Sequence, residues 1–526
     1  MPVSRRVAWG SLTVLIPFQV VYAAITPSQV LVVHNSRAAD SATVLNAYLA
    51  AHPDIPAANV FDLNNTNIVG KADITYTEFV NNIRDPIRNY LDQAGGPSAE
   101  SIISILLIRG IPHRIQDTDI PGVGDNPPQT ELETFTDVNG DDIPDGGDCT
   151  AASVDSELTL LWQDLITRED GLPDAGQLMD TKADNFIDNP YHTRTTSIAS
   201  YSRLNIKNAK TFGNPFAVAW TIAGTGKSRL TQGDFYLVSR IDGNTAADAV
   251  AAIQRAQNLR INRRYARVVL DEHANAALEY DNMDLFDPPN SAYFYAGDDY
   301  DETLSLLQAA GWNVEYEATA VFILPAAVPH PIAAYSSYGE NHITNPPGTG
   351  TYIQGFQFAR GAIFNTYESY NGRALNGLGT LINQEQVADF IAWGGTFGIG
   401  HVWEPFAFTI PDNEFLFVSF LVNGLTWAEA AWSSIPMLSW MHVVIGDPLA
   451  TATIVDQPAD FDADGDVDAA DLELFEACAS GPGIPCVAGC SKADLDLDGD
   501  ADQMDFSLIE RCLSGSDVTA SPTCAD

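Results

Sequence analysis

Short apolar runs alternate with amphipathic segments along most of the chain. Residues 30–34 (VLVVH) and 102–108 (IISILLI) predict buried strands. Residues 41–51 carry apolar side chains at helical spacing, and residues 79–91 predict a second helix with a kink or break at Pro86. Because strands this apolar are buried on both faces, they indicate a parallel sheet that is covered by helices.

The alternation resumes in the second half of the chain. The pattern predicts strands at residues 235–239, 267–270, 293–296, 314 onward, 332–336 and 362–366, and helices at 246–258, 302–310, 386–393 and 427–432. Repeated β-α units favour an α/β fold with a mostly parallel, doubly wound sheet. We therefore expect an α/β main domain at residues 24–455, with a polar insertion at residues 117–150.

Two twelve-residue segments near the C-terminus share one pattern of aspartates. Each has aspartate at positions 1, 3, 5, 7, 9 and 12 and glycine at position 6, and the second begins 34 residues after the first. A Ca²⁺ ion binds roughly six to eight oxygens, and the turn that gathers them needs a residue tolerant of positive φ at position 6. The predicted calcium ligands are Asp460, Asp462, Asp464, Asp466, Asp468 and Asp471 in the first loop, and Asp494, Asp496, Asp498, Asp500, Asp502 and Asp505 in the second.

Each loop leads into a short apolar segment, residues 472–478 and 506–512. This tandem arrangement closely resembles a type I dockerin, here residues 456–526. The resemblance implies calcium as the cofactor and a cohesin-like domain on a scaffold or surface as the partner, and some dockerins attach hydrolases that act on polysaccharides. Five cysteines and a Pro/Gly-rich connector at residues 481–485 depart from the usual dockerin, which bears on cohesin binding and not on the calcium sites.

Cysteines are concentrated in this same C-terminal segment. Five lie there, Cys478, Cys486, Cys490, Cys512 and Cys524, and the sixth is Cys149. Clustering in a small exported unit predicts disulfides, because so short a segment cannot build a sufficient core alone. One of the five stays unpaired within the segment, and the pairing is left open. A zinc site is the alternative, which the lack of CxxC pairs and of histidines in the segment disfavours.

The N-terminus has the features of a secretory signal. Arg5 and Arg6 precede an apolar run at residues 7–22, and Ala23 and Ala24 follow it. We expect cleavage after Ala23, so that residues 1–23 are removed and the chain is secreted or held at the cell surface. The alternative is a membrane anchor, for which this run is short. No later stretch is apolar for long enough to predict a transmembrane segment.

Charge excludes one class of partner. The formal net charge is −43, and a nucleic-acid backbone would be repelled, so we expect no nucleic-acid binding. Part of the acidity lies in the insertion, where Asp137, Asn139, Asp141 and Asp145 space oxygens along the chain and resemble the calcium repeats of thrombospondin type 3. Either a further calcium site or a flexible acidic loop explains this segment.

Polar residues follow several predicted strands, where ligands bind in open α/β sheets. The cleft candidates are Asp155, at the start of a predicted helix, and Arg240 and Asp242, after a predicted strand. The alternative for each is a helix cap or a strand-end turn.

Residues 332–450 resemble the catalytic half of the gingipain-type cysteine peptidases, which have a caspase-like fold. The resemblance rests on two strands followed by polar residues, on Gly394 to His401, and on the closing Ile445-Gly446-Asp447-Pro448. Residues 28–450 also resemble an uncharacterised family of exported bacterial proteins. The peptidases have His-Gly after the first strand and a catalytic cysteine after the second, whereas this chain has Tyr338-Gly339 and Glu368-Ser369. No cysteine lies between Cys149 and Cys478, which excludes cysteine peptidase chemistry here.

Two functions follow from these patterns. The first is an exported calcium-binding protein whose dockerin-like tail docks a gingipain-like α/β domain to a partner or surface. The alternative is an extracellular hydrolase of peptide or polysaccharide bonds with a rebuilt catalytic site. In that site Ser369 and His342 would form the pair, and Glu368 would orient the histidine or hold a metal.

Overall fold

The computed structural model describes residues 24–116, 152–163, 187–208, 210–211, 228–272, 300–342, 346, 350–375, 384–403, 405, 409–487, 489–496 and 498–525. The predicted signal, the insertion at 117–150 with Cys149, and the predicted strand at 293–296 lie outside the described residues.

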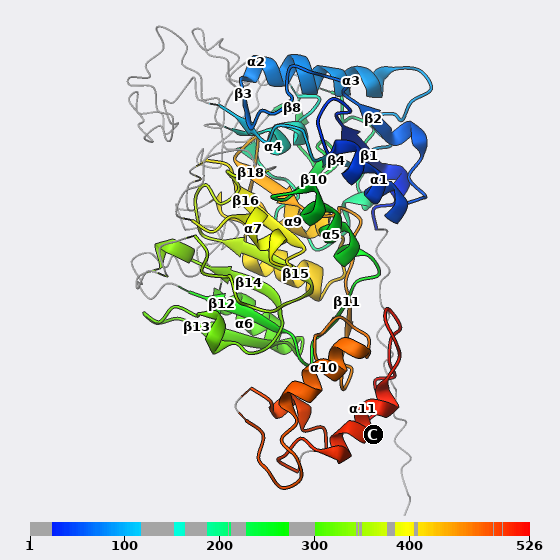
Figure 1. Cartoon of the computed structure of the whole chain (residues 1–526). Helices are drawn as coiled ribbons and strands as arrows, with labels where there is room; N and C mark the ends of the chain where they lie inside the picture. Colours follow the sequence, from blue (N-terminus) through cyan, green and yellow to red (C-terminus); the bar gives the residue numbers. More distant parts are fainter. Residues whose placement is uncertain are drawn as a thin grey trace, which may run out of the picture.

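A ten-stranded sheet forms the centre of the molecule, as Figure 1 shows, in the order β13-β12-β14-β15-β16-β18-β10-β4-β1-β2. Its strands are β1 Val30–His34, β2 Val60–Asp62, β4 Ser104–Ile108, β10 Leu237–Ile241, β12 Arg267–Asp271, β13 Asn313–Glu317, β14 Ile332–Ser337, β15 Phe358–Thr366, β16 Phe397–His401 and β18 His442–Ile445. All neighbouring pairs are parallel except β16 and β18. The predicted α/β class with a mostly parallel sheet is confirmed.

The antiparallel contact between β16 and β18 divides the sheet into two halves that run in opposite directions. His401 pairs with His442, and Gly398 pairs with Ile445. Strand β10 is parallel to β18, so the end of β10 lies at the opposite edge of the sheet from the ends of β14 and β15. Asp242, which follows β10, and Glu368, which follows β15, therefore lie at opposite ends of the sheet. The sequence did not predict β18 as a strand and so could not give its direction.

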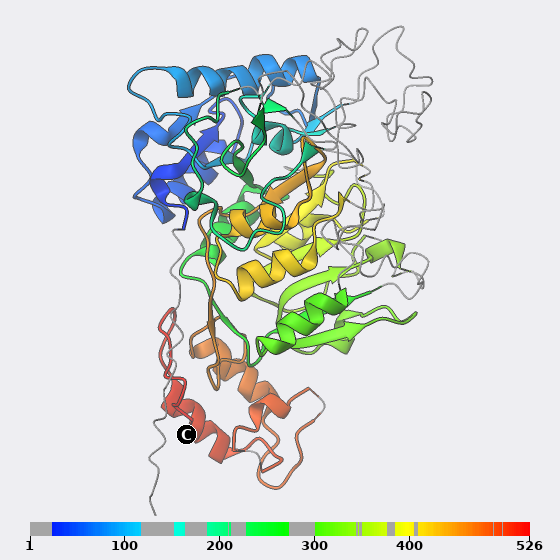
Figure 2. The same ribbon diagram turned by 180° about the vertical axis from the view of Figure 1, so that it is seen from behind.

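Helices cover both faces of the sheet. Helices α1 Ser41–Ala51, α5 Ala246–Ala256 and α7 Val387–Ala392 lie on the face seen in Figure 1. Helices α6 Tyr300–Ala309 and α9 Trp427–Ser434 lie on the face seen in Figure 2. This two-sided cover explains why the central strands are fully buried.

The helix predicted at residues 79–91 is part of a longer helical run. It comprises α2 Tyr76–Phe79, a π-helical turn Val80–Arg84 and α3 Asp85–Asp92. Pro86 lacks an N–H, and its ring would clash with the carbonyl four residues earlier in a regular α-helix. The wider turn before Pro86 relieves that clash without ending the helix.

The C-terminal residues 456–526, which we call the tail, follow strand β19 Thr453–Val455 and contain helices α10 Ala469–Cys478 and α11 Gln503–Cys512. Disulfides join Cys478 to Cys490 and Cys512 to Cys524, and Cys486 is free. Disulfides and one unpaired cysteine in the tail are thus as predicted. No helix among the described residues combines the length and the apolar character needed to cross a bilayer.

Candidate metal centres

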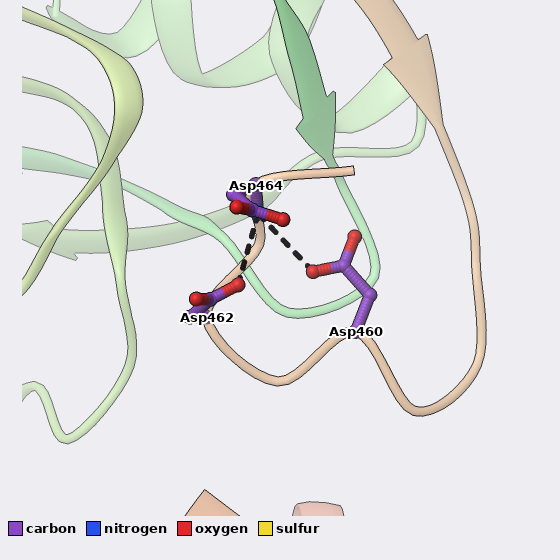
Figure 3. Close-up of side chains that lie close together, drawn as sticks. All are labelled: Asp460, Asp462 and Asp464. Atoms are coloured by element: carbon purple, nitrogen blue, oxygen red, sulfur yellow. Dashed lines mark hydrogen bonds between the residues drawn. The ribbon is translucent and has the colours of Figure 1, made fainter. Parts of the chain in front are cut away.

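The first acidic loop, residues 460–471, is folded around its own carboxylates. Asp460 accepts backbone N–H groups from Asp464 at 3.1 Å and from Gly465 at 2.9 Å, and Asp462 accepts from Asp464 at 3.3 Å. Figure 3 shows these three aspartates turned toward one another. Gly465 has φ 95°, the left-handed region that the sequence pattern required at position 6.

The last aspartate closes the first loop. Asp471 Oδ1 accepts the backbone N–H of Phe461 at 2.5 Å and that of Asp462 at 3.3 Å, while its Oδ2 accepts from Asp468 at 2.8 Å. Position 12 thereby lies against positions 2, 3 and 9 of the loop. Asp468 also caps α10, so that helix begins three residues before the predicted apolar segment.

The second loop, residues 494–505, repeats this geometry. Asp494 accepts from Asp498 and Gly499, each at 3.0 Å, and Gly499 has φ 99°. Asp505 accepts from Leu495 at 2.6 Å, Asp496 at 3.1 Å and Asp502 at 2.8 Å. The same hydrogen bonds therefore form at the same loop positions 34 residues apart.

The carboxylates of both loops are close enough to share a cation. Four groups have ligand oxygens within 4.8 Å of one another: Asp460, Asp462 and Asp464; Asp466, Asp468 and Asp471; Asp494, Asp496 and Asp505; Asp500, Asp502 and Asp505. Two oxygens on one Ca²⁺ ion lie at most about 4.8 Å apart, since each is about 2.4 Å from the ion. Both loops can hold a metal ion.

A buried carboxylate oxygen at position 7 of each loop fits a bound cation. Asp466 and Asp500 are only 3% and 6% exposed. One oxygen of each accepts a backbone N–H, from Asp517 and from Gly483 respectively. The other oxygen of each has no hydrogen-bond partner among the described residues. Leaving such an oxygen buried and unpaired is unfavourable, and a cation in the loop would offset that cost.

Without a cation, the first loop retains protons at neutral pH. Burial, together with Asp471, Asp462 and Asp464, raises the pKa of Asp460 to about 9. Burial and neighbouring carboxylates also raise the pKa of Asp471 to about 7 and that of Asp462 to about 6. The loop thus concentrates negative charge that needs either protons or a metal ion.

Each loop is hydrogen-bonded to the segment that follows the helix of the other loop. The backbone N–H groups of Ser514 and Gly515 donate to Val467 in the first loop, and those of Ser480 and Gly481 donate to Ala501 in the second. The Ser514 hydroxyl accepts from Val467 and the Ser480 hydroxyl accepts from Ala501, each at 3.0 Å. These serines were not predicted as functional, although a Ser-Gly pair repeats at the same 34-residue spacing as the loops.

In the α/β domain, each of the three proposed catalytic residues contacts its own set of neighbouring residues. Glu368 is buried and accepts from Tyr352 at 2.5 Å, from Thr366 at 3.0 Å and from the backbone of Glu340 at 3.0 Å. Burial raises the pKa of Glu368 to about 7.

The other two proposed catalytic residues lie beside different side chains. His342 Nε2 is 3.4 Å from Asp271 Oδ1, and Ser369 Oγ accepts from Gln384 at 3.2 Å. Asp271 was not predicted because it lies 71 positions before His342, and Tyr352 was not predicted although it lies only 16 positions before Glu368.

The cleft candidates form a buried ion network. Arg240 donates to Asp155 at 2.9 and 2.5 Å and lies 3.6 Å from Asp242, while Arg109 donates to Asp242 at 2.8 Å. All four side chains are buried, so the network pairs its charges inside the protein. Ser153 caps the helix α4 Val154–Thr159 by accepting from Ser156, which is the alternative that the sequence offered for this segment.

Comparison with known proteins does not assign the chain to a family. No protein-family model matches the sequence, and no curated protein matches it. The candidate calcium residues of the insertion, Asp137, Asn139, Asp141 and Asp145, lie outside the described residues.

Proposed function

We propose that the chain is an exported protein whose tail binds two calcium ions and docks the α/β domain to a partner on a scaffold or surface. The observation that carries the calcium assignment is the loop geometry that repeats after 34 residues, in which carboxylate oxygens lie within 4.8 Å of one another. The predicted secretory signal and the two disulfides support an extracellular location.

Calcium fits these loops better than other common metal ions. Every candidate side-chain ligand is a carboxylate oxygen, whereas zinc prefers nitrogen and sulfur. Magnesium keeps several waters and a strict octahedron, which a flexible twelve-residue loop does not impose. In each loop, the carboxylates at positions 1, 3, 5 and 12 and the backbone carbonyl at position 7 would hold the ion, with position 9 acting through water. The bound ion would neutralise the crowded carboxylates and fix the loop.

The docking role rests on the dockerin-like arrangement and on exposed apolar side chains of the tail. Ile484, Val487, Met504 and Leu513 expose large apolar side chains in that region. A cohesin-like or other surface protein is the expected partner.

Calorimetric titration of residues 24–526 with calcium tests the metal assignment. We expect about two ions per chain, and the double substitution Asp460→Ala with Asp494→Ala should abolish binding because position 1 is a ligand in both loops. Glu510→Ala, an exposed carboxylate of α11 outside the loops, is the matched control and should leave both sites intact. Undiminished binding by the double variant would contradict the assignment.

A second candidate function is hydrolysis of peptide or polysaccharide bonds by the α/β domain. It is favoured by Glu368, a buried carboxyl whose pKa is raised to about 7 and which directly precedes Ser369 in the sequence. The full chain should then turn over a mixed peptide or polysaccharide substrate, and Glu368→Gln or Ser369→Ala should remove that activity. Absence of turnover on every substrate would leave the α/β domain as docked cargo without this chemistry.

A further inference from the structure

The two acidic loops differ in their surroundings, although their internal geometry is the same. Asp460 is buried, whereas its counterpart Asp494 is only half-buried. Asp462 is half-buried and its counterpart Asp496 is exposed. A Cβ added to Gly465 would lie 2.2 Å from the side chain of Arg260 in the α/β domain, while one added to Gly499 would meet no atom within 4 Å. The first loop therefore packs directly against the α/β domain.

Asn262 connects the first loop to the α/β domain by hydrogen bonds. It is the last residue of strand β11 Arg260–Asn262, which pairs in parallel with β19. Its side chain donates to the carbonyl of Gln457 at 2.7 Å and accepts from the backbone N–H of Gln457 at 3.2 Å. Its backbone N–H donates to the carbonyl of Ala463 in the first loop at 3.4 Å. Asn262, a buried residue of the α/β domain, thus contacts both Gln457, which precedes the first loop, and Ala463 within that loop.

Tyr265 forms a second connection between the α/β domain and the first loop. Its hydroxyl accepts the backbone N–H of Ala459 at 3.1 Å, and its ring lies 5.5 Å from that of Phe461. Phe461 and Val467 belong to the same cluster of buried apolar side chains as the strands of the large sheet. That cluster includes Ala501 of the second loop as well, so the direct contacts of Tyr265 with Ala459 and Phe461 are what connect the first loop to the α/β domain.

The end of the tail adds polar contacts at the same interface. Arg360 donates to the carboxylate of Asp517 at 2.9 Å, and Arg260 donates to its carbonyl at 3.4 Å. By the 34-residue spacing, the counterparts of Asp517 and Ala520 are Gly483 and Cys486, beside which Ile484 and Val487 are exposed. The end of the tail at Asp517 is thus docked on the α/β domain, whereas the equivalent residues 483–487 are mostly exposed.

We infer that the first loop is a structural calcium site of the α/β domain, and that the second loop serves the tail alone. This inference rests on the proposed binding of calcium to both loops. An ion that binds only the folded loop stabilises every element that must be in place to hold that loop. Asn262 and Tyr265 belong to those elements for the first loop, where they act as positioning residues. The second loop has no such contacts among the described residues.

Tryptophan fluorescence can separate the two sites, because all nine tryptophans lie before residue 441 and none lies in the tail. Thermal unfolding of residues 24–526 would be followed by this signal, with excess calcium and with excess chelator. The variants are Asp462→Ala and Asp496→Ala, a pair at position 3 of the two loops whose carboxylates accept the same backbone hydrogen bond. Calorimetry would count the calcium ions bound to each variant.

We expect calcium to raise the tryptophan-monitored midpoint of the wild type and of Asp496→Ala by about 3 °C at a concentration about 100-fold above the dissociation constant. Asp462→Ala should lose that shift while still binding one ion. Equal shifts in both variants, or no shift in a wild type that binds two ions, would overturn the inference. A wild type that binds no calcium would instead contradict the proposed function.

Tyr265→Phe provides a test that leaves every carboxylate in place. It removes the hydrogen bond to Ala459 and keeps the aromatic contact with Phe461. We expect this variant to bind two ions and to show a smaller calcium-induced shift than the wild type. A full shift would mean that this contact does not couple the loop to the α/β domain, and would count against the inference.

Discussion

Glu368 and Glu385 lie next to each other in the interior of the α/β domain. The backbone N–H of Glu385 donates to Glu368 at 3.4 Å, and both side chains are buried. Burial raises the pKa of Glu368 to about 7, and burial together with Glu368 and Asp389 raises that of Glu385 to about 9. At neutral pH this region of the protein holds at least one carboxyl proton that a solvated glutamate would have released.

The stability of the α/β domain should therefore fall as the pH rises. Both folded-state pKa values lie above the ordinary glutamate value, so the folded chain binds more protons than the unfolded chain between about pH 4.5 and 9. Their stabilising contribution is complete below that window and is lost as the pH passes through the folded values. Denaturant unfolding at saturating calcium should show a decrease of roughly 1 kcal/mol or more between pH 6 and 8.

Substitution of Glu385 tests the origin of this slope. Glu385→Gln keeps the shape of the side chain and removes its titration, so the curve of unfolding free energy against pH should become flatter. Glu476→Gln, at an exposed carboxylate of α10, should leave the slope unchanged. A variant Glu385→Gln with the wild-type slope would assign the pH dependence to other groups.

At the scale of single elements, strand β10 shows where the sequence pattern stops being informative. The apolar run at residues 235–239 predicted a strand ending before Arg240, yet β10 continues through Arg240 to Ile241. Arg240 can be buried in a strand because Asp155, which lies 85 positions earlier, neutralises it. Local periodicity identified β1 and α1 to the residue, since their burial follows from their own apolar positions.

The candidate sites also differ in whether local sequence was enough to predict them. The acidic loops were found from sequence because all their ligands lie within twelve consecutive residues. The surroundings of Glu368 and the contacts of Asn262 were not found, because their partners come from segments that meet only in the folded chain. Strand β18 was not predicted from the sequence, and no nearby residue specifies which neighbours it pairs with or in which direction.

The ion network at β10 should contribute strongly to stability through its pairing. Asp155→Ala would leave Arg240 charged and buried beside fewer acceptors, and we expect a loss of about 3 kcal/mol in the free energy of unfolding. Asp92→Ala removes the exposed pair with Lys207 and should change stability by less than about 1 kcal/mol. Equal losses in the two variants, measured by denaturant unfolding, would mean that burial does not strengthen the Asp155 pair.

At the scale of the whole molecule, the tail is both a candidate calcium module and a part of the main core. The buried apolar cluster that fills the sheet domain also includes Phe461, Val467, Phe475 and Ile509 of the tail. Because the carboxylates of each loop repel one another without a cation, removal of calcium should loosen the tail first.

Limited proteolysis should reveal this loosening. In excess chelator we expect cleavage within residues 456–526 to become about tenfold faster than in excess calcium, because local opening exposes the backbone to the protease. Fragments would be identified by mass spectrometry. In excess calcium, the variant Asp496→Ala should be cleaved mainly in the second half of the tail, which contains the altered loop. Equal resistance in calcium and in chelator would show that no cation is needed to hold the tail together.

The place of β18 in the sheet has a consequence for biosynthesis. This strand joins the two half-sheets, yet it is formed by residues His442–Ile445, after every other strand of that sheet has been synthesised. A nascent chain can assemble one half-sheet from β2, β1, β4 and β10 and the other from β13, β12, β14, β15 and β16. Each half-sheet keeps an unpaired edge strand until the ribosome has passed residue 445. Premature termination before that point should yield aggregating fragments, since open strand edges pair with other chains.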